Sequence, residues 1–426
     1  MSIKRLEVKN FKSFKELNIE LGRFNVIIGA NASGKSNFVH ILKFLRDITT
    51  SGLDNAISMQ GGVEYLRNMN IGASQDLVLK VVSDREFRLS RPLRKTGILG
   101  IKIYETIYEF GLRFNKRGSG FKVVNDSLTL KCEFERKERK VKETFGKGII
   151  QILHRNGNVK INLDVPHEVL LKKEEVFWPF LQEEKSLKNL LKLLREGKSQ
   201  KNVLILEIPF IVFIQPIVRI FSDISIYDFD PKLPKKATPI TGKAELEEDG
   251  SNLSIILKNI TENKEKRRQL FNLVKDLLPF VEDLDVEKFA DKSLLFKLKE
   301  LYFKNQYLPA SLISDGTINI TALIIALYFE KKSFIIVEEP ERNIHPSLIS
   351  KVVGMMKDAS QKKQIVVTTH NPEFVKYAGL ENILLVSRDE NGFSSIFRPA
   401  DREEIKTFLK NDIGIEELYI QNLLEV

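Results

Sequence analysis

The segment Gly29-Ala-Asn-Ala-Ser-Gly-Lys-Ser36 has the residue types and spacing of a phosphate-binding loop, G-x-x-x-x-G-K-S. Glycines let the backbone N–H groups of such a loop surround phosphates, and a helix that begins there adds partial positive charge. Lys35 would reach the β and γ phosphates of a nucleotide, and the Ser36 hydroxyl would ligate Mg²⁺. An ordinary Gly/Ser loop entering a helix is the plainer interpretation, but it does not require this lysine and hydroxyl in register.

The loop lies between two elements that suit this chemistry. Phe24–Ile28 is a short apolar run, typical of a buried central strand. Beyond the loop, apolar residues recur with helical spacing at Phe38, Ile41, Leu42 and Leu45, which indicates an amphipathic helix. Strand, loop and helix therefore follow one another as a nucleotide site requires.

A second candidate site lies about 300 residues further along the chain, where the apolar run Phe334–Val337 ends in Glu338 and Glu339. A phosphate-binding-loop site needs one acid for the Mg²⁺ shell and often a second to activate the attacking water. Adjacent residues on a strand point to opposite faces, but a turn at the strand's end can bring both into one cleft. The alternative is a strand that ends at a charged surface.

Two further segments could contact a nucleotide. Ser314-Asp-Gly-Thr317 precedes an apolar helical pattern over 318–328, so these residues either cap that helix or bind a phosphate presented by another molecule. Ile365–Thr369 is another buried-strand pattern, and His370 follows it. Open α/β sheets place their ligand sites at the carboxyl ends of their strands.

The composition is that of a globular chain with no strong bias. Its 426 residues suggest two or three domains. Lys and Arg number 67 against 57 Asp and Glu, and a net charge of +10 permits a nucleic-acid partner without demanding one. The single cysteine, Cys132, excludes an internal disulfide framework and a cysteine-based metal cluster, and favours a reducing compartment, the cytoplasm.

No targeting or membrane segment is expected. Residues 1–10 alternate charge with apolarity and lack the apolar core of a signal peptide. The most apolar stretch, 202–221, has an uncharged run over 208–218, which is shorter than the ~20 residues that a membrane span needs. We interpret this stretch as part of a core.

Hydrophobic periodicity divides the chain into regions of different secondary structure. Residues 3–21 predict a hairpin or meander with one buried face, 76–165 predict many short strands, and 167–196 predict helix. The expected strands are 77–82, 101–107, 108–114, 127–134, 294–308, 334–337 and 365–367, and the other expected helices are 252–260 and 264–278. The charge run 133–142 is interpreted as a solvated edge strand rather than a nucleic-acid contact.

The four motifs in this order resemble those of ABC-type ATPases of the RecF, OLD and structural-maintenance-of-chromosomes kind. The chain is most similar to the stand-alone "AAA family" ATPases of prokaryotes, which often lie beside defence genes. By this resemblance Glu338 belongs to Walker B, Glu339 is the catalytic glutamate, His370 is the switch histidine, and residues 341–346 form the D-loop. Asn10-Phe-Lys-Ser-Phe14 is similar to the family's N-terminal motif, which makes Lys12 a candidate for nucleotide binding.

The resemblance also implies the remaining binding residues. Walker A would bind the nucleotide of its own chain, and Ser314–Thr317, the signature motif, would bind that of a partner chain. The implied nucleotide-binding residues besides Lys12 are Gly29, Asn31, Ala32, Ser33, Gly34, Lys35, Ser36, Asn37, Ser314, Asp315, Gly316 and Thr317. The implied Mg²⁺ ligands are Ser36 and Glu338.

Some features depart from the family pattern or lie outside it. The family usually has Asp where this chain has Glu338, and its Mg²⁺-contacting glutamine has no obvious counterpart, so Gln60 is a candidate against a plain turn residue. The segment Asp249–Leu253 also resembles the sequences of the family. The aspartates of Asp228-x-Asp230 and 283–285 are expected to be local caps rather than metal ligands. The 56 residues after His370 leave no room for the nuclease domain of OLD proteins, and no long heptad run predicts a coiled coil.

The sequence therefore predicts an α/β P-loop NTPase, an ABC-type ATPase head with a β-rich extension and a helical insertion. We expect residues 1–165 and 291–426 to form the two lobes of the head, and 166–290 a mainly helical insertion. ATP and Mg²⁺ are the expected cofactors, and the partner a second copy across an ATP sandwich. The expected role is an ATPase acting on DNA or an effector in genome maintenance or antiviral defence. The alternative is a slow or non-hydrolysing ATP-dependent scaffold that holds and restrains a separately encoded nuclease or toxin. A transporter subunit is disfavoured by residues 10–14 and by the long insertion.

Overall fold

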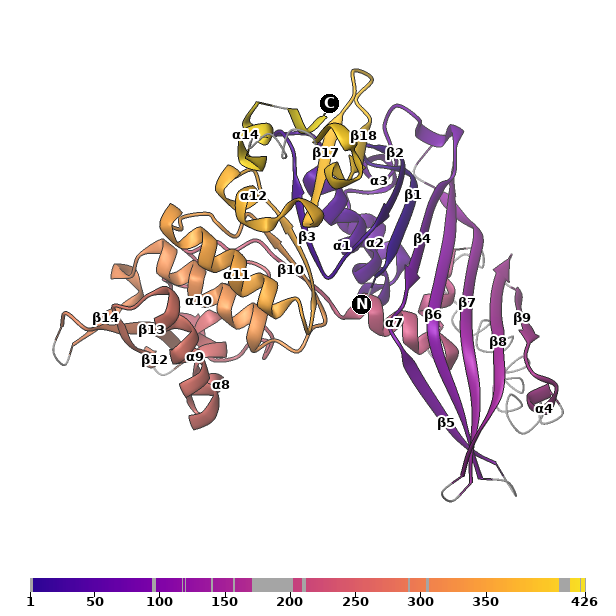
Figure 1. Cartoon of the computed structure of the whole chain (residues 1–426), viewed down its shortest axis with the longest axis horizontal. Helices are drawn as coiled ribbons and strands as arrows, with labels where there is room; N and C mark the ends of the chain where they lie inside the picture. Colours follow the sequence, from indigo (N-terminus) through magenta and orange to yellow (C-terminus); the bar gives the residue numbers. More distant parts are fainter. Residues whose placement is uncertain are drawn as a thin grey trace. The chain divides into compact units, whose positions relative to one another are not determined.

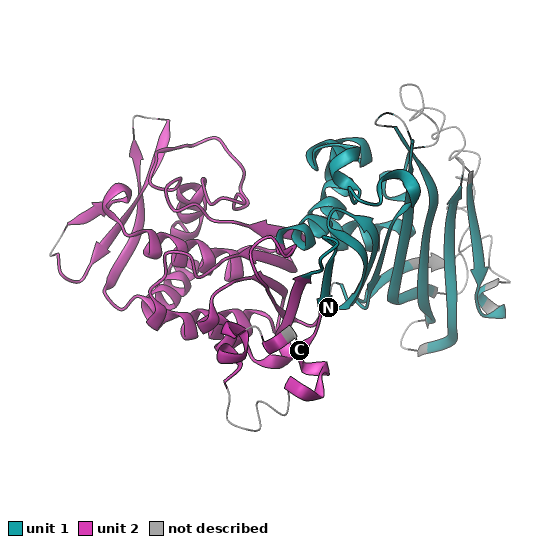
Figure 2. Cartoon of the chain, turned by 90° about the horizontal axis from the view of Figure 1, so that it is seen from above, with its two compact units in different colours: residues 1–21, 36–223, 388–396 teal, residues 22–35, 224–387, 397–426 magenta. Residues whose placement is uncertain are grey.

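The computed structural model describes residues 3–93, 97–116, 118, 120–138, 141–155, 158–170, 202–208, 212–289, 292–303, 306–405, 414–421 and 423–425. The chain divides into two compact units, coloured separately in Figure 2. Unit 1 contains residues 1–21, 36–223 and 388–396, and unit 2 contains 22–35, 224–387 and 397–426. Residues 187–194, part of the segment 167–196 that the sequence predicts to be helical, lie outside the described residues. The division into residues 1–165, 166–290 and 291–426 stays a prediction.

Unit 1 is built on an eight-stranded sheet of order β2-β1-β4-β6-β7-β8-β9, with β5 pairing β6, and every pair in it is antiparallel. Figure 1 shows the long strands β6, β7 and β8 side by side. The strands are β1 (Arg5–Phe11), β2 (Phe14–Glu20), β4 (Leu77–Ser83), β5 (Phe87–Leu93), β6 (Gly97–Phe114), β7 (Phe121–Glu138), β8 (Val141–Arg155) and β9 (Asn158–Asp164). The predicted hairpin over 3–21 is confirmed by the pairing of β1 with β2.

Helices cover this sheet, and α1 carries the apolar face that its sequence predicts. Phe38, Ile41, Leu42 and Leu45 are all fully buried. Phe44 of α1 packs between two rings of the sheet, at 6.0 Å from Phe11 and 6.4 Å from Phe110 between ring centroids. The helices of unit 1 are α1 (Lys35–Ser51, whose first residue belongs to unit 2), α2 (Leu53–Met59), α3 (Val63–Leu66), α4 (His167–Leu170) and α7 (Gln215–Ser222), with short 3₁₀ turns at 72–74, 205–207 and 212–214.

Two sequence predictions for the sheet of unit 1 are wrong. The expected strands 101–107 and 108–114 are one strand, β6, because its register with β7 continues through Ile107 and Tyr108 with no turn between them. The charge run beginning at Glu133 is not on an edge, since β7 pairs with β6 on one side and β8 on the other. On a strand that is paired at both edges, alternating charged residues can lie on the solvated face of the sheet. Lys131 of β7 is an example, since it forms an ion pair of 2.6 Å with Glu105 of β6.

Unit 2 contains the parallel strands that position the predicted site. They belong to a sheet of order β10-β15-β16-β3-β17-β18, in which β10, β15, β16, β3 and β17 pair in parallel. β3 and β16 are buried at every residue, as their apolar sequences predict. The strands of this sheet are β3 (Phe24–Ile28), β10 (Ile224–Tyr227), β15 (Phe334–Glu338), β16 (Gln364–Thr368), β17 (Ile383–Arg388) and β18 (Ser394–Phe397), of which Arg388 and residues 394–396 are assigned to unit 1.

The rest of unit 2 combines helices with a small antiparallel sheet of order β11-β13-β12, in which β14 pairs β13. The predicted helices at 252–260 and 264–278 are confirmed as α8 and α9. The elements are α8 (Leu253–Thr261), α9 (Lys264–Leu277), α10 (Asp315–Tyr328), α11 (Ile349–Ala359), α12 (Pro372–Ala378), α14 (Ile415–Ile420), β11 (Thr238–Pro239), β12 (Val281–Phe289), β13 (Ser293–Glu300) and β14 (Tyr307–Pro309), with 3₁₀ turns at 310–312, 346–348, 380–382, 399–401 and 423–425.

The segment 166–290, expected to be mainly helical, also contributes strands. β10 pairs with β15 of the parallel sheet, and β12 belongs to the small sheet. Within the described residues no helix is both long enough and apolar enough to cross a membrane. In the apolar stretch 202–221, the described residues form 3₁₀ turns and the eight-residue helix α7, and Ile217, Ile220 and Phe221 are fully buried.

A buried polar network joins three strands of unit 1 to the segment after residue 201. Asp126 on β7 is fully buried and accepts hydrogen bonds from the Tyr108 hydroxyl at 2.9 Å and from the Ile205 backbone N–H at 2.5 Å. Nδ1 of His154 on β8 lies 3.3 Å from the same carboxylate. Burial raises the pKa of Asp126, and the bonds from His154, Ile205 and Tyr108 oppose that rise.

We predict that Asp126→Ala lowers the free energy of unfolding by about 3 kcal/mol, because it leaves buried polar groups on Tyr108, Ile205 and His154 without their acceptor. Urea denaturation followed by circular dichroism measures this change. Asp164→Ala is the control: Asp164 is exposed on β9, and its loss should change stability by less than about 0.5 kcal/mol. Equal effects of the two substitutions would contradict a structural role for the network.

Candidate functional site

The Gly29–Gly34 loop connects β3 to α1, and its backbone conformations require small residues. Gly29 has φ +151°, and a Cβ atom there would lie 2.3 Å from the Val386 carbonyl oxygen. Gly34 has φ +121°, and Ala32, which is not glycine, has φ +63°. Asn31 and Ala32 are exposed at the tip of the loop, whereas Ser33 and Gly34 are buried. The loop thus curves tightly between β3 and α1, as phosphate-binding loops do.

Lys35 covers this loop with its side chain. Its Nζ donates to the carbonyl oxygen of Gly29 at 2.7 Å and of Ala30 at 2.9 Å. Burial lowers the pKa of Lys35, and the negative charge of Glu339 opposes that shift. The predicted phosphate-binding lysine and the predicted catalytic glutamate therefore influence each other electrostatically within unit 2.

Glu338 and Glu339 lie where the sequence predicts, at the carboxyl end of β15. Glu338 is the last residue of the strand and pairs with Thr368 of β16. Glu339 has φ +44°, a left-handed conformation that is uncommon for a residue other than glycine. Its backbone N–H donates to the Thr368 carbonyl oxygen at 2.9 Å. This turn ends the alternation of the strand directly after Glu338.

The Glu339 carboxylate is held from both of its oxygens. Oε1 lies 3.2 Å from Nδ1 of His370, and Oε2 accepts a hydrogen bond of 2.9 Å from Nη2 of Arg342. Burial raises the pKa of Glu339, but the hydrogen bond and charge of Arg342, with those of His370, outweigh it and lower the pKa below its usual range. The structure thus brings Glu339 and His370 together as the sequence predicts.

Three residues near Glu339 make contacts that sequence reasoning does not predict, since Glu341 and Arg342 are expected only as part of the D-loop and Asp228 as a local cap. Arg342 and Asp228 form an ion pair of 2.9 Å, and Glu341 is buried, with Oε1 accepting a bond of 2.5 Å from the Thr369 hydroxyl. Burial raises the pKa of Glu341. Their positions in the sequence could have indicated a shared site. Asp228 directly follows β10, and Glu341 and Arg342 follow β15, which pairs with β10 in the sheet.

The aspartate pairs serve different structural purposes. Asp230 is a local cap as expected, since its Oδ1 accepts from the Lys232 N–H at 3.0 Å. Asp228 is not: it pairs with Arg342 across the sheet edge. Asp283 binds the Tyr307 hydroxyl and Arg267, both at 2.7 Å. Across the described residues, no group of three or more His, Cys, Asp and Glu side chains is arranged to hold a metal ion.

Ser314 is the N-cap of α10. Its Oγ accepts from the Thr317 N–H at 3.1 Å and lies 2.8 Å from the Thr317 hydroxyl. Asp315 forms an ion pair of 2.5 Å with Lys235. The helix-cap interpretation is therefore correct, and the role of the same residues toward a partner's nucleotide stays a prediction.

The start of α10 packs closely against the 341–346 loop. A Cβ atom on Gly316 would lie 2.5 Å from the Asn343 carbonyl oxygen, so glycine is required there by contact with backbone. One turn later, Asn319 donates from Nδ2 to the Arg342 carbonyl oxygen at 2.8 Å. The predicted signature motif and D-loop are thus in direct contact within unit 2.

In unit 1, Lys12 lines a basic hollow of about 390 Å³ together with Arg67 and Arg388. Lys12 has φ +45°, and burial lowers its pKa. The Arg67 guanidinium lies 5.5 Å from the centre of the Phe114 ring. Asn10 has a structural role in the N-terminal motif, because its Nδ2 donates to the Gly72 and Gln75 carbonyl oxygens.

The other predicted site residues of unit 1 are distributed along α1 and α2. Ser36 is exposed in the first turn of α1, and Asn37 donates from Nδ2 to the Ser13 hydroxyl at 2.8 Å. Gln60 is buried and caps the carboxyl end of α2 with its backbone N–H. Its role as a Mg²⁺ contact stays a prediction, beside the alternative of a turn residue.

A family described as "AAA domain, putative AbiEii toxin, Type IV TA system" matches residues 24–376. The match includes the Gly29–Ser36 loop, the Ser314–Thr317 segment, Glu338, Glu339 and His370. It therefore covers all of the motifs except the N-terminal one that contains Lys12.

The curated relatives match short stretches of the chain. Endonuclease GajA of Bacillus cereus is 45% identical over 47 residues, which are 11% of this chain and 8% of that protein. The chromosome partition protein Smc of Methanocaldococcus jannaschii is 36% identical over 66 residues, 15% of this chain and 6% of that protein. The chain thus spans less than a tenth of the length of these relatives.

Solved structures of Smc heads are similar at low identity. One, bound to the C-winged helix domain of ScpA, covers 93% of this chain and 97% of its own, at 15% identity and a TM-score of 0.49. Another, with an extended coiled coil and bound to the C-terminal domain of ScpA from Pyrococcus furiosus, covers 96% and 99%, at 16% identity and a TM-score of 0.45.

We predict that Gly316→Ala lowers the free energy of unfolding by about 1–3 kcal/mol, because the added methyl group must displace the Asn343 backbone. Gly354→Ala is the matched control: Gly354 lies exposed in α11 with nothing within 4 Å of its would-be Cβ. That change should stabilise the chain by about 0.5–1 kcal/mol. Thermal and urea unfolding measure both, and stabilisation by Gly316→Ala would refute the close packing of α10 on the loop.

Proposed function

The chain belongs to this AAA-domain family and has the fold of an ABC-type P-loop ATPase head, and on that premise we propose that it binds ATP with Mg²⁺ and hydrolyses ATP. One observation carries the proposal. The Gly29–Gly34 loop and Glu339 directly follow β3 and β15, and His370 is the second residue after β16, the strand that lies between them in parallel pairing. Ligand sites of open α/β sheets form at these carboxyl ends.

The residues of the loop have the donors that a nucleotide needs. Backbone N–H groups of the loop would bind the phosphates, and Lys35 would exchange its bonds to the Gly29 and Ala30 carbonyl oxygens for phosphate oxygens. Ser36 and Glu338 offer a hydroxyl and a carboxylate, oxygen ligands of the kind that Mg²⁺ accepts besides phosphates and water. The bound ion would neutralise charge that develops on the phosphates.

Glu339 is the proposed general base. At neutral pH a glutamate is a carboxylate, the form that accepts a proton from the attacking water, and the lowered pKa of Glu339 makes it a weaker base than an ordinary glutamate. His370, 3.2 Å from Oε1, would fix the orientation of that carboxylate. Lys12 and Gln60 remain predicted contacts to the nucleotide and to Mg²⁺.

We further propose that two chains sandwich two ATP molecules, with Ser314–Thr317 of each facing the nucleotide of the other. The N-terminus of α10 supports this, because helix N-termini favour phosphate through their free N–H groups and partial positive charge. ATP would then join the two heads, and hydrolysis would release them.

DNA or a partner effector is the proposed target. The net charge of +10 permits DNA binding, and the similar stretches in GajA and Smc belong to an endonuclease and a chromosome partition protein by name. The second candidate function is a slow ATP-dependent scaffold for a separately encoded nuclease or toxin. One observation favours it: both oxygens of Glu339 are engaged by His370 and Arg342.

Turnover with and without DNA distinguishes these two functions. We predict that double-stranded DNA raises the ATPase rate several-fold at low salt, and that added salt abolishes the stimulation because phosphate contacts release counterions. Phosphate release at a series of DNA and salt concentrations measures this. Slow turnover that DNA does not change would support the scaffold and contradict the DNA-stimulated ATPase.

For the ATP-bridged dimer, we predict that Glu339→Gln forms a stable dimer with ATP and Mg²⁺. The amide keeps the size of the side chain but removes the base, which typically costs about 10²–10⁴ in rate. Adding Ser314→Arg should abolish this dimer, because a bulky side chain would occupy the place of the partner's γ-phosphate. Light scattering measures the mass of each variant.

Two controls make this experiment decisive. Lys35→Ala should bind ATP at least about tenfold more weakly and form no dimer, because it lacks the charge that faces the β and γ phosphates. The double variant should still bind ATP in a calorimetric titration. An ATP-dependent dimer that survives Ser314→Arg would mean that Ser314 is only the cap of α10.

A further inference from the structure

Arg342 lies between two carboxylates at the edge of the parallel sheet. Nη1 donates to Oδ1 of Asp228, and Nη2 donates to Oε2 of Glu339, both at 2.9 Å. A planar guanidinium presents its donors in a fixed fork, so these two bonds fix the direction of each acceptor relative to the other. The side chain of Arg342 is 43% exposed, which leaves it accessible to solvent while paired.

The backbone of Arg342 is also fixed. Its N–H donates to the Glu339 carbonyl oxygen at 3.0 Å, which closes a turn after the strand. Its carbonyl oxygen accepts the 2.8 Å bond from Asn319 of α10. The guanidinium therefore projects from a backbone that is held at both of its polar groups, and its position is determined by the fold.

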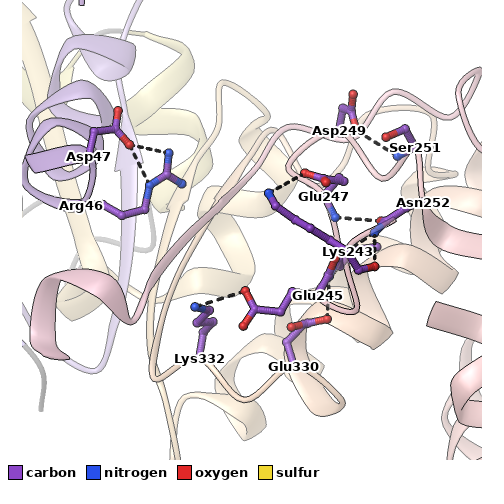
Figure 3. A network of polar contacts seen from close by, with 11 residues as sticks. Arg46, Asp47, Lys243, Glu245, Glu247, Asp249, Ser251, Asn252, Glu330 and Lys332 are labelled. Carbon is purple, nitrogen blue, oxygen red and sulfur yellow. Dashed lines mark hydrogen bonds and ion pairs between the residues drawn. The ribbon is translucent and has the colours of Figure 1, made fainter. Parts of the chain in front are cut away.

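Asp228, the other partner, is held by a separate loop. Its N–H donates to the Glu248 carbonyl oxygen at 2.9 Å, and the N–H of Asp230 donates to that of Asp249 at 3.1 Å. Figure 3 shows how the residues 243–252 that form this loop are joined. Asn252 is central, because Oδ1 accepts from the Glu247 N–H at 2.8 Å and Nδ2 donates to the Lys243 and Glu245 carbonyl oxygens.

The same loop is attached to the segment between α10 and β15. Glu330 accepts a bond of 2.9 Å from the Leu246 N–H, and Lys332 forms an ion pair of 3.3 Å with Glu245 (Figure 3). Asp249 accepts from the Ser251 N–H at 2.9 Å. Asp228 thus extends toward Arg342 from beside a braced loop, whose bonds include Asp249 and Asn252 of the segment Asp249–Leu253.

We propose that Arg342 is a positioning residue for Glu339 and that Asp228 in turn positions Arg342. The inference rests on the proposed hydrolysis of ATP, in which Glu339 is the general base. Arg342 touches Glu339 rather than the reacting atoms, so its action is through the direction of that carboxylate.

The charges near Glu339 explain why such a residue is needed. Lys35 also attracts Glu339, and a carboxylate that turned toward Lys35 would compete with the phosphates for the ammonium group. Arg342 and His370 each contact one oxygen of the Glu339 carboxylate, which keeps these oxygens away from Lys35. A general base must lie within hydrogen-bond reach of the water it activates, and small misplacements of catalytic groups cost rate rather than binding.

The test compares turnover with ATP affinity in the full-length chain. We predict that Arg342→Gln lowers kcat about tenfold and leaves the Kd for ATP and Mg²⁺ unchanged. Arg342→Lys should recover part of the loss, because one ammonium group restores the charge but not the fork. Asp228→Asn should lower kcat by about threefold, and combining it with Arg342→Gln should add nothing further, since the two act in series.

Arg267→Gln is the matched control. Arg267 pairs with Asp283 at 2.7 Å, is 43% exposed like Arg342, and contacts no predicted site residue through that pair. Its kcat should equal that of the wild type, and thermal unfolding should show that all variants are folded.

The outcomes distinguish a failure of the proposed function from a failure of the positioning role of Arg342. A wild-type chain that binds ATP but does not hydrolyse it would refute the proposed function and with it the role of Arg342. A hydrolysing wild type with an Arg342→Gln variant of equal or higher kcat would refute the positioning role alone. A weaker Kd with unchanged kcat would also refute it, because Arg342 would then act in binding.

Discussion

The parallel pairing of β3, β16 and β15 is the constraint on which the rest of the site depends. Their backbone bonds continue past the strands, where Thr369 donates to Ile27 and Glu339 donates to Thr368. These bonds bring together residues near positions 28, 338 and 368 at one sheet edge. Parallel strands need long crossover connections, and here the connections carry α1, α10 and α11. Glycines, glutamates and a histidine thereby converge from distant parts of the chain.

Sequence reasoning could predict what local patterns determine. The apolar run before Glu338 could only be a buried strand or helix, and its length of four residues decides for a strand, observed as the five-residue β15. The spacing of Phe38, Ile41, Leu42 and Leu45 likewise indicates one helical face. Asp230 was predicted as a local cap and is one, because its acceptor bond is to a backbone N–H only two residues away. The family motifs extended this to Glu339 and His370.

What the sequence could not show depends on partners that are far apart. Asp228 has the same local pattern as Asp230, yet it pairs with Arg342, 114 residues later, because β10 pairs with β15. The charge run at Glu133 is compatible with an edge or a central strand, and only the partners on both sides decide. β6 continues unbroken through Ile107, where the sequence has no turn residue. The division into two strands at that position therefore had no local signal behind it.

One loop of five residues, from Glu339 to Asn343, connects the parts of the site. Glu339 carries the proposed base, Glu341 binds Thr369 beside His370, and Asn343 contacts Gly316 at the start of α10. Asn343, like Glu339, has a left-handed backbone, with φ +63°, so both ends of the loop hold conformations that neighbouring contacts must maintain. The start of α10 thus contacts the same loop that carries Glu339, through Gly316 beside Asn343 and Asn319 on the Arg342 carbonyl oxygen. In the proposed dimer, Ser314 at the start of this helix would face the partner's nucleotide, so this loop would lie between the docking residues and the proposed base.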